Sequence, residues 1–154
     1  MSLPVLNFPP INPRYQKNEK GTVQLFDTIR KKYIDLTPEE WVRQHLINFL
    51  FENLSVPKSK ITVEKQLKLN NTIKRTDVLV FDAGIKPLLL IECKAPEIEL
   101  NQATINQVFN YNLTLHVPFI LISNGLNHIF LDNSTEKPQI IKSIPSYKEM
   151  LSKV

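Results

Sequence analysis

Two carboxylates and a lysine stand beside the ends of two apolar segments. Glu92, Cys93 and Lys94 directly follow an apolar run, residues 88–91, and Asp77 directly precedes another. Side chains alternate between the two faces of a β-strand, so Glu92 and Lys94 share one face and Cys93 occupies the other. Charged groups at the end of a buried strand are costly unless they pair or bind a ligand. The pattern therefore predicts a functional site here, with a simple Glu–Lys salt bridge as the alternative.

A turn signal at residues 82–84 predicts where Asp77 lies relative to Glu92. Antiparallel strands joined by one tight turn bring the start of one strand beside the end of the next, so the two carboxylates should converge. Carboxylate oxygens suit Mg²⁺, which keeps several waters and accepts phosphate oxygens. The backbone carbonyl of Cys93 could supply a third oxygen. The metal would polarise a phosphodiester, and Lys94 would orient or activate the attacking water.

A first helix is predicted to begin after Thr37, which suits the N-cap position. Pro38 suits the first helical position, and Glu40 stands where a capping box places its carboxylate. Apolar residues recur at helical spacing through residues 41–51, and Pro57 closes the segment. The sequence therefore predicts a helix that buries one apolar stripe.

Three strands are predicted after this helix. Residues 61–69 alternate between apolar and polar, as in a half-buried strand, and the Asn-Asn pair at 70–71 signals a turn. Residues 73–82 form the second strand and residues 87–94 the third. Three successive strands joined by short turns make an antiparallel meander. The later predicted elements are a helix at 100–114, a fully apolar strand at 117–123, a strand at 127–131, an edge strand at 140–141 and a short helix at 147–151.

The order of these elements predicts one mixed α/β domain that covers residues 23–154. Residues 1–22 contain four prolines and are expected to form an extended N-terminal arm. The following segment, residues 23–36, could form one or two short strands. A chain of 154 residues lies within the range of roughly 100–200 residues typical of one domain.

The composition favours a folded protein and excludes several classes. Hydrophobic residues make up 42% of the chain, and the net charge of +4 permits an anionic partner without requiring nucleic acid. No apolar run approaches the roughly 18 residues of a membrane span, and the N-terminus lacks the pattern of a signal peptide. The single cysteine, Cys93, allows no internal disulfide and no cysteine-rich zinc site. We therefore expect a cytoplasmic protein that does not cross a membrane.

The chemically capable residues resemble a known nuclease signature. Asp77 with the Glu-Cys-Lys sequence at 92–94 resembles the PD-(D/E)XK nuclease motif. Gln107 and Tyr111, as Gln-x-x-x-Tyr on the next helix, resemble the additional motif of its RecB-type branch. Over about residues 24–132 the chain is similar to the N-terminal nuclease domain of type I restriction enzyme R subunits. The stretches that carry this similarity are 37–44, 74–77, 90–96 and 123–125.

The resemblance implies a fold and a role for the residues of the motif. The fold would be a restriction-endonuclease-like core. Asp77 and Glu92 would bind Mg²⁺ or Mn²⁺, with the Cys93 carbonyl as a further ligand, and Lys94 would be the catalytic lysine. The implied activity is that of a metal-dependent DNA endonuclease of restriction-enzyme type, which hydrolyses phosphodiester bonds.

Supporting residues are implied on both helices. Gln107 and Tyr111 would face the site, although without the resemblance they would be read as a surface amide and a core ring. A carboxylate on the first helix often completes such sites, and either Glu39 or Glu40 could serve. Glu40 also has the alternative role of capping partner to Thr37.

The expected partners are DNA and other restriction–modification subunits. Lys74 and Arg75, beside Asp77, could contact phosphates, or could be ordinary solvated charges. In the resembled family this domain is fused to a motor, whereas this chain has three glycines and no phosphate-binding loop of the Walker type. Cutting both strands needs two active sites, which favours a homodimer or a partner subunit. The alternatives are a non-catalytic DNA-binding or partner-docking module with the same fold, and a nuclease acting on RNA or branched DNA.

Overall fold

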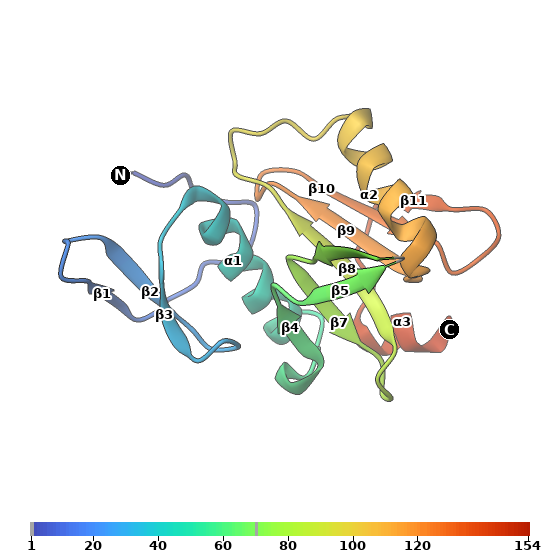
Figure 1. Cartoon of the computed structure of the whole chain (residues 1–154), viewed down its shortest axis with the longest axis horizontal. Coiled ribbons are helices and arrows are strands. Elements are labelled where there is room, and N and C mark those ends of the chain that lie inside the picture. The colour runs from blue at the N-terminus through green and yellow to red at the C-terminus, as the bar shows by residue number, and fades with distance from the viewer. Residues whose placement is uncertain (1, 70) are drawn as a thin grey trace.

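The computed structural model describes residues 2–69 and 71–154. Its centre is a six-stranded sheet with the order β11-β10-β9-β8-β7-β4, which has α1 and α3 packed on one face and α2 on the other (Figure 1). The elements of this layered core are α1 (Pro38–Glu52), β4 (Ile61–Val63), β7 (Val78–Phe81), β8 (Pro87–Cys93), α2 (Gln102–Leu115), β9 (Phe119–Ser123), β10 (His128–Asp132), β11 (Gln139–Ile141) and α3 (Tyr147–Ser152). The predicted mixed α/β class is confirmed. Within the described part of the chain, no helix has the length and apolar character to cross a membrane.

The helix α1 begins where its sequence signals place it. The Thr37 hydroxyl accepts a hydrogen bond from the Glu40 backbone N–H at 3.1 Å, which satisfies one unpaired donor of the first turn. Val42, Leu46 and Leu50 are completely buried on the core side of the helix. Burial of this apolar stripe holds α1 against the sheet and leaves its polar first turn near the site.

The first two predicted strands are each divided, so the expectation of two continuous strands is wrong. Residues 61–69 form β4 and β5 (Gln66–Leu69), and residues 73–82 contain β7 and most of β6 (Thr72–Arg75). Glu64, between β4 and β5, has a φ of 54°, a left-handed conformation that interrupts a strand. As a result β5 and β6 pair as a separate hairpin, and the predicted antiparallel meander consists of β4, β7 and β8.

The β5–β6 hairpin is anchored at its base. Both the backbone N–H and the hydroxyl of Thr76 donate to the Lys65 carbonyl oxygen at 2.9 Å. In the predicted Asn-Asn turn, Asn71 has a φ of 66°, which asparagine tolerates, and Asn70 lies outside the described residues. The hairpin lies in front of the central sheet and extends towards α2 (Figure 1).

The middle of the sheet is built from β8 and β9, which run parallel. Their register pairs Leu89 with Phe119 and Cys93 with Ser123, and every residue of β9 is buried. This explains why residues 119–122 of β9 are all apolar, because a strand covered on both faces has no solvent side. The crossover through α2 brings the carboxyl ends of β8 and β9 together at one edge. The predicted edge strand and the last helix are confirmed as β11 and α3.

A small second sheet precedes α1. It has the order β1-β2-β3, with β1 (Tyr15–Lys17), β2 (Val23–Asp27) and β3 (Lys32–Asp35). The segment predicted as one or two strands therefore forms two, and β1, within the expected arm, pairs with β2. The residues ahead of β1 pack on the core, where buried Leu6 lies against Gly125.

Candidate active site

Asp77 and Glu92 meet at the carboxyl end of β8. Asp77 precedes β7, and the register pairs its neighbour Val78 with Ile91. One oxygen of Asp77, Oδ2, accepts a hydrogen bond of 2.7 Å from the backbone N–H of Cys93, the residue after Glu92. The tight turn that joins β7 to β8 therefore places the two carboxylates at the same end of the sheet.

Lys94 lies on the same face as Glu92. Its Nζ atom is 3.4 Å from Glu92 Oε1, and each of the two side chains is 29% exposed. Cys93 is buried in the core layer on the α1 side, where burial raises the pKa of its thiol. The strand alternation expected from the sequence thus holds, with two charged groups open to solvent and the thiol packed behind them.

The surroundings of Glu92 disfavour the charged form of its carboxylate when no metal is bound. Burial, followed by the nearby charge of Asp77, raises its pKa from the ordinary 4.5 to about 7, although the Lys94 ammonium acts in the opposite direction. Two carboxylates that repel each other in a half-buried site attract a cation. A perturbed pKa of this kind is also typical of functional sites.

The stability of the metal-free protein should decrease as pH rises, because of Glu92. A folded-state pKa of about 7, above the ordinary 4.5, means that this group contributes stability fully present below pH 4.5 and lost as pH rises through 7. After allowance for partial exposure, we expect the free energy of unfolding to fall by about 1–2 kcal/mol between roughly pH 5 and pH 8. Urea unfolding in EDTA measures this change. Glu92→Gln should flatten the profile, and identical profiles for the variant and the wild type would contradict the assignment.

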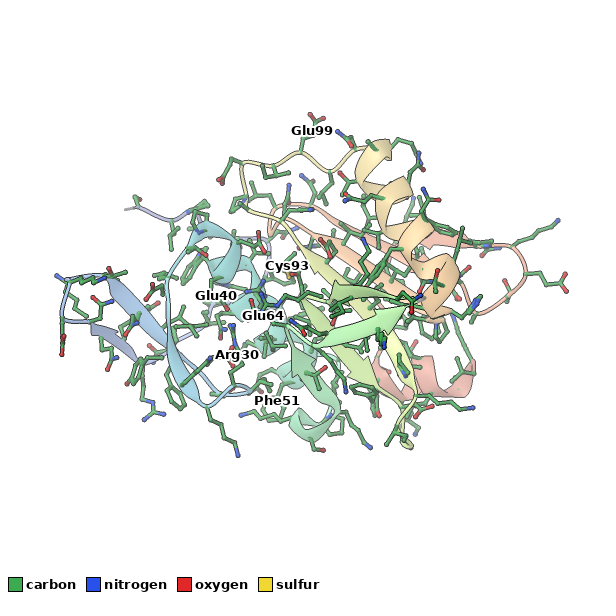
Figure 2. The ribbon with its side chains drawn as sticks, viewed as in Figure 1. Arg30, Glu40, Phe51, Glu64, Cys93 and Glu99 are labelled. Atoms are coloured by element: carbon green, nitrogen blue, oxygen red, sulfur yellow. The ribbon has the colours of Figure 1, made fainter. Side chains whose placement is uncertain are left out.

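The two acidic residues at the start of α1 have different surroundings. The Glu40 carboxylate is buried and accepts hydrogen bonds from Arg30, Arg43 and, at 3.0 Å, the Gln44 amide. It does not return to the N-cap, so Glu40 forms only half of the predicted capping box. Figure 2 shows Arg30 and Glu40 between the N-terminal sheet and the central sheet.

The Glu39 carboxylate on α1 is close enough to the candidate site to be affected by the charge of Asp77. The Glu39 side chain is 46% exposed, and Oε1 lies 3.2 Å from Arg43 Nη2. Its pKa is raised, first by burial and then by the charge of Asp77. The sequence left open whether Glu39 or Glu40 serves the site. The contacts favour Glu39, which lies on the solvent side, because Glu40 is linked to Asp77 only through Arg43.

Sequence reasoning missed the two arginines that surround these acids. Arg43 Nη2 lies 3.4 Å from Asp77 Oδ1, and Arg30 binds both Glu40 and the completely buried Asp27. The spacing of Glu40 and Arg43, three positions apart on a helix, was an available signal for their pairing. No local pattern indicated that Arg30, from the turn between β2 and β3, would join them.

The predicted supporting residues of α2 line a cavity beside Glu92. This cavity of about 160 Å³ is bounded by the β5–β6 hairpin, through Lys74 and Arg75, and by α2, through Gln107 and Tyr111. Lys74 Nζ lies 5.7 Å from the centre of the Tyr111 ring. A larger cavity of about 220 Å³ lies between the N-terminal segment and α1, and its lining contains neither Asp77 nor Glu92.

Tyr111 and Glu92 line the same cavity. The pKa of Tyr111 is raised by burial and by the charges of Glu92 and Asp77. The hydroxyl oxygen is buried, and among the described residues it has no hydrogen-bond partner. Buried polar atoms are usually satisfied, so this hydroxyl is available to a ligand. Gln107, one turn earlier, is exposed on the same cavity.

The donor set fits a hard divalent cation. Among the described residues, no three side chains of His, Cys, Asp or Glu are arranged to hold a metal ion. The candidate ligands are instead two carboxylates, Asp77 and Glu92, and the pKa of Glu92 is raised by burial and then by the charge of Asp77. Mg²⁺ is commonly bound by one or two carboxylates and keeps several waters, so the residues present suit Mg²⁺ or Mn²⁺.

Comparisons with known proteins identify the family of the chain. The family model described as type I restriction enzyme R protein N terminus matches residues 38–145. A type I restriction enzyme EcoAI endonuclease subunit from Escherichia coli is 27% identical over 108 residues, which cover 66% of this chain and 13% of that protein. This chain therefore spans a small part of the length of that relative.

A solved structure shares the fold. It is a fragment ascribed to an HsdR subunit of a type I restriction enzyme from Vibrio vulnificus YJ016. The match has a TM-score of 0.56 and 20% sequence identity, and it covers 77% of this chain and 25% of the solved one. The likeness supports a restriction-endonuclease-like core. Because the family model covers more than half of the sequence, the chain belongs to the family of the type I restriction enzyme R protein N terminus.

Proposed function

We propose that the chain is a metal-dependent DNA endonuclease of restriction-enzyme type. The observation that carries the proposal is the convergence of Asp77, Glu92 and Lys94 at the end of β8, where the pKa of Glu92 is raised to about 7. Two hard oxygen ligands and an ammonium at one solvent-accessible point are groups that can promote phosphodiester hydrolysis. Family membership supports the same activity.

Each residue of the site has a distinct role in this proposal. Asp77 and Glu92, with the Cys93 carbonyl, would hold Mg²⁺ or Mn²⁺, which supplies a Lewis acid to the phosphate when bound. The backbone N–H of Cys93 keeps Asp77 oriented through the 2.7 Å hydrogen bond. The Lys94 Nζ atom lies beside Glu92, where it can orient the attacking water and offset charge on the phosphate.

The α2 residues position the substrate in the adjoining cavity. Tyr111 can donate its unpartnered hydroxyl to a phosphate oxygen, and Gln107 can contact the neighbouring backbone from the same helix face. Glu39 stands on the solvent side of Asp77 and is the better candidate for an additional acidic contribution from α1.

Cleavage of supercoiled plasmid by the purified chain tests the proposal. We expect nicking with Mg²⁺ or Mn²⁺, none with EDTA, and a loss of at least about a hundredfold in Glu92→Ala. The matched control is Glu99→Ala, because Glu99 is exposed and points outward ahead of α2 (Figure 2). Equal rates in the wild type and Glu92→Ala would contradict the assignment. DNA binding without cleavage in either metal would favour the non-catalytic module.

The β5–β6 hairpin is proposed as a phosphate-binding surface. Lys65, Lys68, Lys74 and Arg75 on this hairpin are exposed, and the last two line the cavity that opens on Glu92. Basic side chains in such positions contact phosphates and place a duplex without reading its sequence. The substrate strand would thus pass between the hairpin and α2.

Removal of these charges should weaken DNA binding in a salt-dependent way. For each of Lys74→Ala and Arg75→Ala, the slope of log K against log salt concentration should decrease in magnitude by about 1. Lys148→Ala, an exposed lysine on α3, is the control, because α3 packs on the opposite face of the sheet. Fluorescence anisotropy with a labelled duplex measures the slopes. A slope unchanged in both hairpin variants would mean that Lys74 and Arg75 are ordinary solvated charges. Competition with RNA and branched DNA is a separate measurement, which would identify the preferred substrate.

The wider setting follows from the same proposal. DNA and the other subunits of a restriction–modification system are the proposed partners, and the cytoplasm is the proposed location. Cleavage of both strands requires a second active site, which a homodimer or a partner subunit would supply.

A further inference from the structure

Arg43 joins the acidic residues of α1 to the candidate metal ligand Asp77. Its side chain is only 6% exposed, and its Nη2 atom lies 3.2 Å from Glu39 Oε1 and 3.4 Å from Asp77 Oδ1. The other terminal nitrogen, Nη1, donates to Glu40. One guanidinium therefore contacts three carboxylates, and its positive charge is permanent because arginine is not deprotonated in proteins.

Arg43 is not the only residue that compensates the negative charge of Glu40. Arg30 also donates to Glu40, and the Gln44 amide adds a hydrogen bond of 3.0 Å. Because a second arginine serves Glu40, part of the positive charge of Arg43 remains available to Asp77.

Asp77 is fully engaged in this arrangement. Its Oδ2 atom accepts from the Cys93 backbone N–H, and its Oδ1 atom faces Arg43. Within the described part of the chain, Arg43 is the only cationic side chain that forms an ion pair with Asp77, whereas Lys94 pairs with Glu92. The oxygen of Asp77 that is not bonded to the Cys93 N–H is therefore beside a positive charge of the protein itself.

We propose that Arg43 is a built-in counter-cation that holds Asp77 in the metal-free protein and competes with a divalent metal for the same carboxylate. This inference rests on the proposed metal-dependent function. Arg43 is thus a positioning residue that sets how tightly the site takes its metal. Arg43, the competitor of the metal, is part of α1. Arg30 supports Arg43 from the turn between β2 and β3, because both arginines pair with Glu40.

Loss of the Arg43 charge should strengthen metal binding. A unit positive charge a few ångströms from Asp77 repels a divalent ion, and the repulsion survives partial screening by water. We expect Arg43→Gln to lower the Kd for Mn²⁺ by a factor of about three or more. A residue that only supported the fold would leave the affinity of the folded protein unchanged or weaken it, so the direction of the change separates the two roles.

The test is a titration with Mn²⁺ alone, in the absence of DNA, at a temperature where each variant is folded. Free Mn²⁺ is counted by electron paramagnetic resonance. Arg30→Gln is the matched control, because it removes the same charge from the same buried cluster, and among the described contacts Arg30 has none with Asp77. If Arg43→Gln does not fold, Arg43→Gln combined with Glu40→Gln removes the buried pair together and keeps the net charge.

The possible outcomes are distinct. Tighter Mn²⁺ binding in the Arg43 variant, with a clearly smaller gain in Arg30→Gln, would support the inference. Weaker or equal binding, or an equal gain in Arg30→Gln, would overturn it while the proposed function stands. A wild-type protein that binds no Mn²⁺ would contradict the proposed function and remove the competition with it.

A measurement without metal completes the test. Urea unfolding of Arg43→Gln, Asp77→Asn and the double variant, all in EDTA, gives the coupling between the two side chains. The double variant should be less destabilised than the sum of the single variants, because the counter-cation has no charge left to hold. Additive effects would overturn the inference whatever the metal affinities are.

Discussion

Lys94→Ala is expected to reduce the rate of DNA cleavage by a factor of about 10²–10⁴, the range typical of a lost general acid–base group. Lys94 places an ammonium group beside the candidate metal ligands, with its Nζ 3.4 Å from Glu92 Oε1. Binding of DNA should change much less, because one phosphate contact is a small part of the total. Single-turnover nicking in Mn²⁺, alongside anisotropy for binding, measures the two effects separately.

Two further variants decide what the lysine does. Lys94→Arg keeps the positive charge but gives up a proton far less readily, so it should remain inactive if Lys94 handles a proton and recover if only its charge matters. Lys86→Ala is the control for loss of a lysine, because Lys86 is exposed and immediately precedes the opposite end of β8. A decrease of less than about tenfold in Lys94→Ala would remove this lysine from the mechanism.

Asp27→Ala should lower the free energy of unfolding by about 3–5 kcal/mol, the usual cost of breaking a buried charge pair. Asp27 is completely buried on β2. Its Oδ2 accepts from Arg30 Nε at 2.6 Å and from the Gln44 amide at 3.0 Å, and its Oδ1 accepts from two backbone N–H groups. Its removal takes away one of the two carboxylates that Arg30 and Gln44 share, the other being Glu40, so both α1 and the β2–β3 turn lose support.

Urea unfolding checks this prediction, with Asp35→Ala as the control on the same sheet. Asp35 is exposed and accepts one hydrogen bond from Gln24, so its loss should cost little. The hydrogen bonds and charge of Arg30 lower the pKa of Asp27 against the opposing effect of burial. This contribution to stability is therefore present at neutral pH and is lost as pH falls through that lowered pKa. A cost below about 1 kcal/mol would mean that the cluster is not a source of stability.

The same cluster connects the N-terminal sheet to the candidate active site. The family match begins at residue 38, after β1, β2 and β3. Asp27 and Arg30 nevertheless bind Gln44 and Glu40 of α1, and Arg43 on that helix contacts Asp77. A continuous path of buried charge thus runs from the N-terminal sheet to the candidate active site. Deletion of the sheet should therefore affect the site as well as the fold.

Much of the layered core could be predicted from local signals. The Thr37 cap, the apolar stripe of α1 and the apolar run of β9 each depend on neighbouring residues and appeared where expected. The division of the first two strands was missed because it depends on a left-handed residue, Glu64, of a type that rarely signals one. The hairpin it releases carries Lys74 and Arg75 to the cavity beside Glu92.

The arrangement of Glu92, Cys93 and Lys94 at the end of β8 could be predicted from the sequence alone. Strand alternation is a local property of the backbone, so it determined that Glu92 and Lys94 share one face and that the Cys93 thiol is buried. Only the tertiary structure decided which acidic residue of α1 is near Asp77 and which cations accompany it. Those contacts join α1, the β2–β3 turn and the start of β7, and no short stretch of sequence contains the charges that must compensate each other.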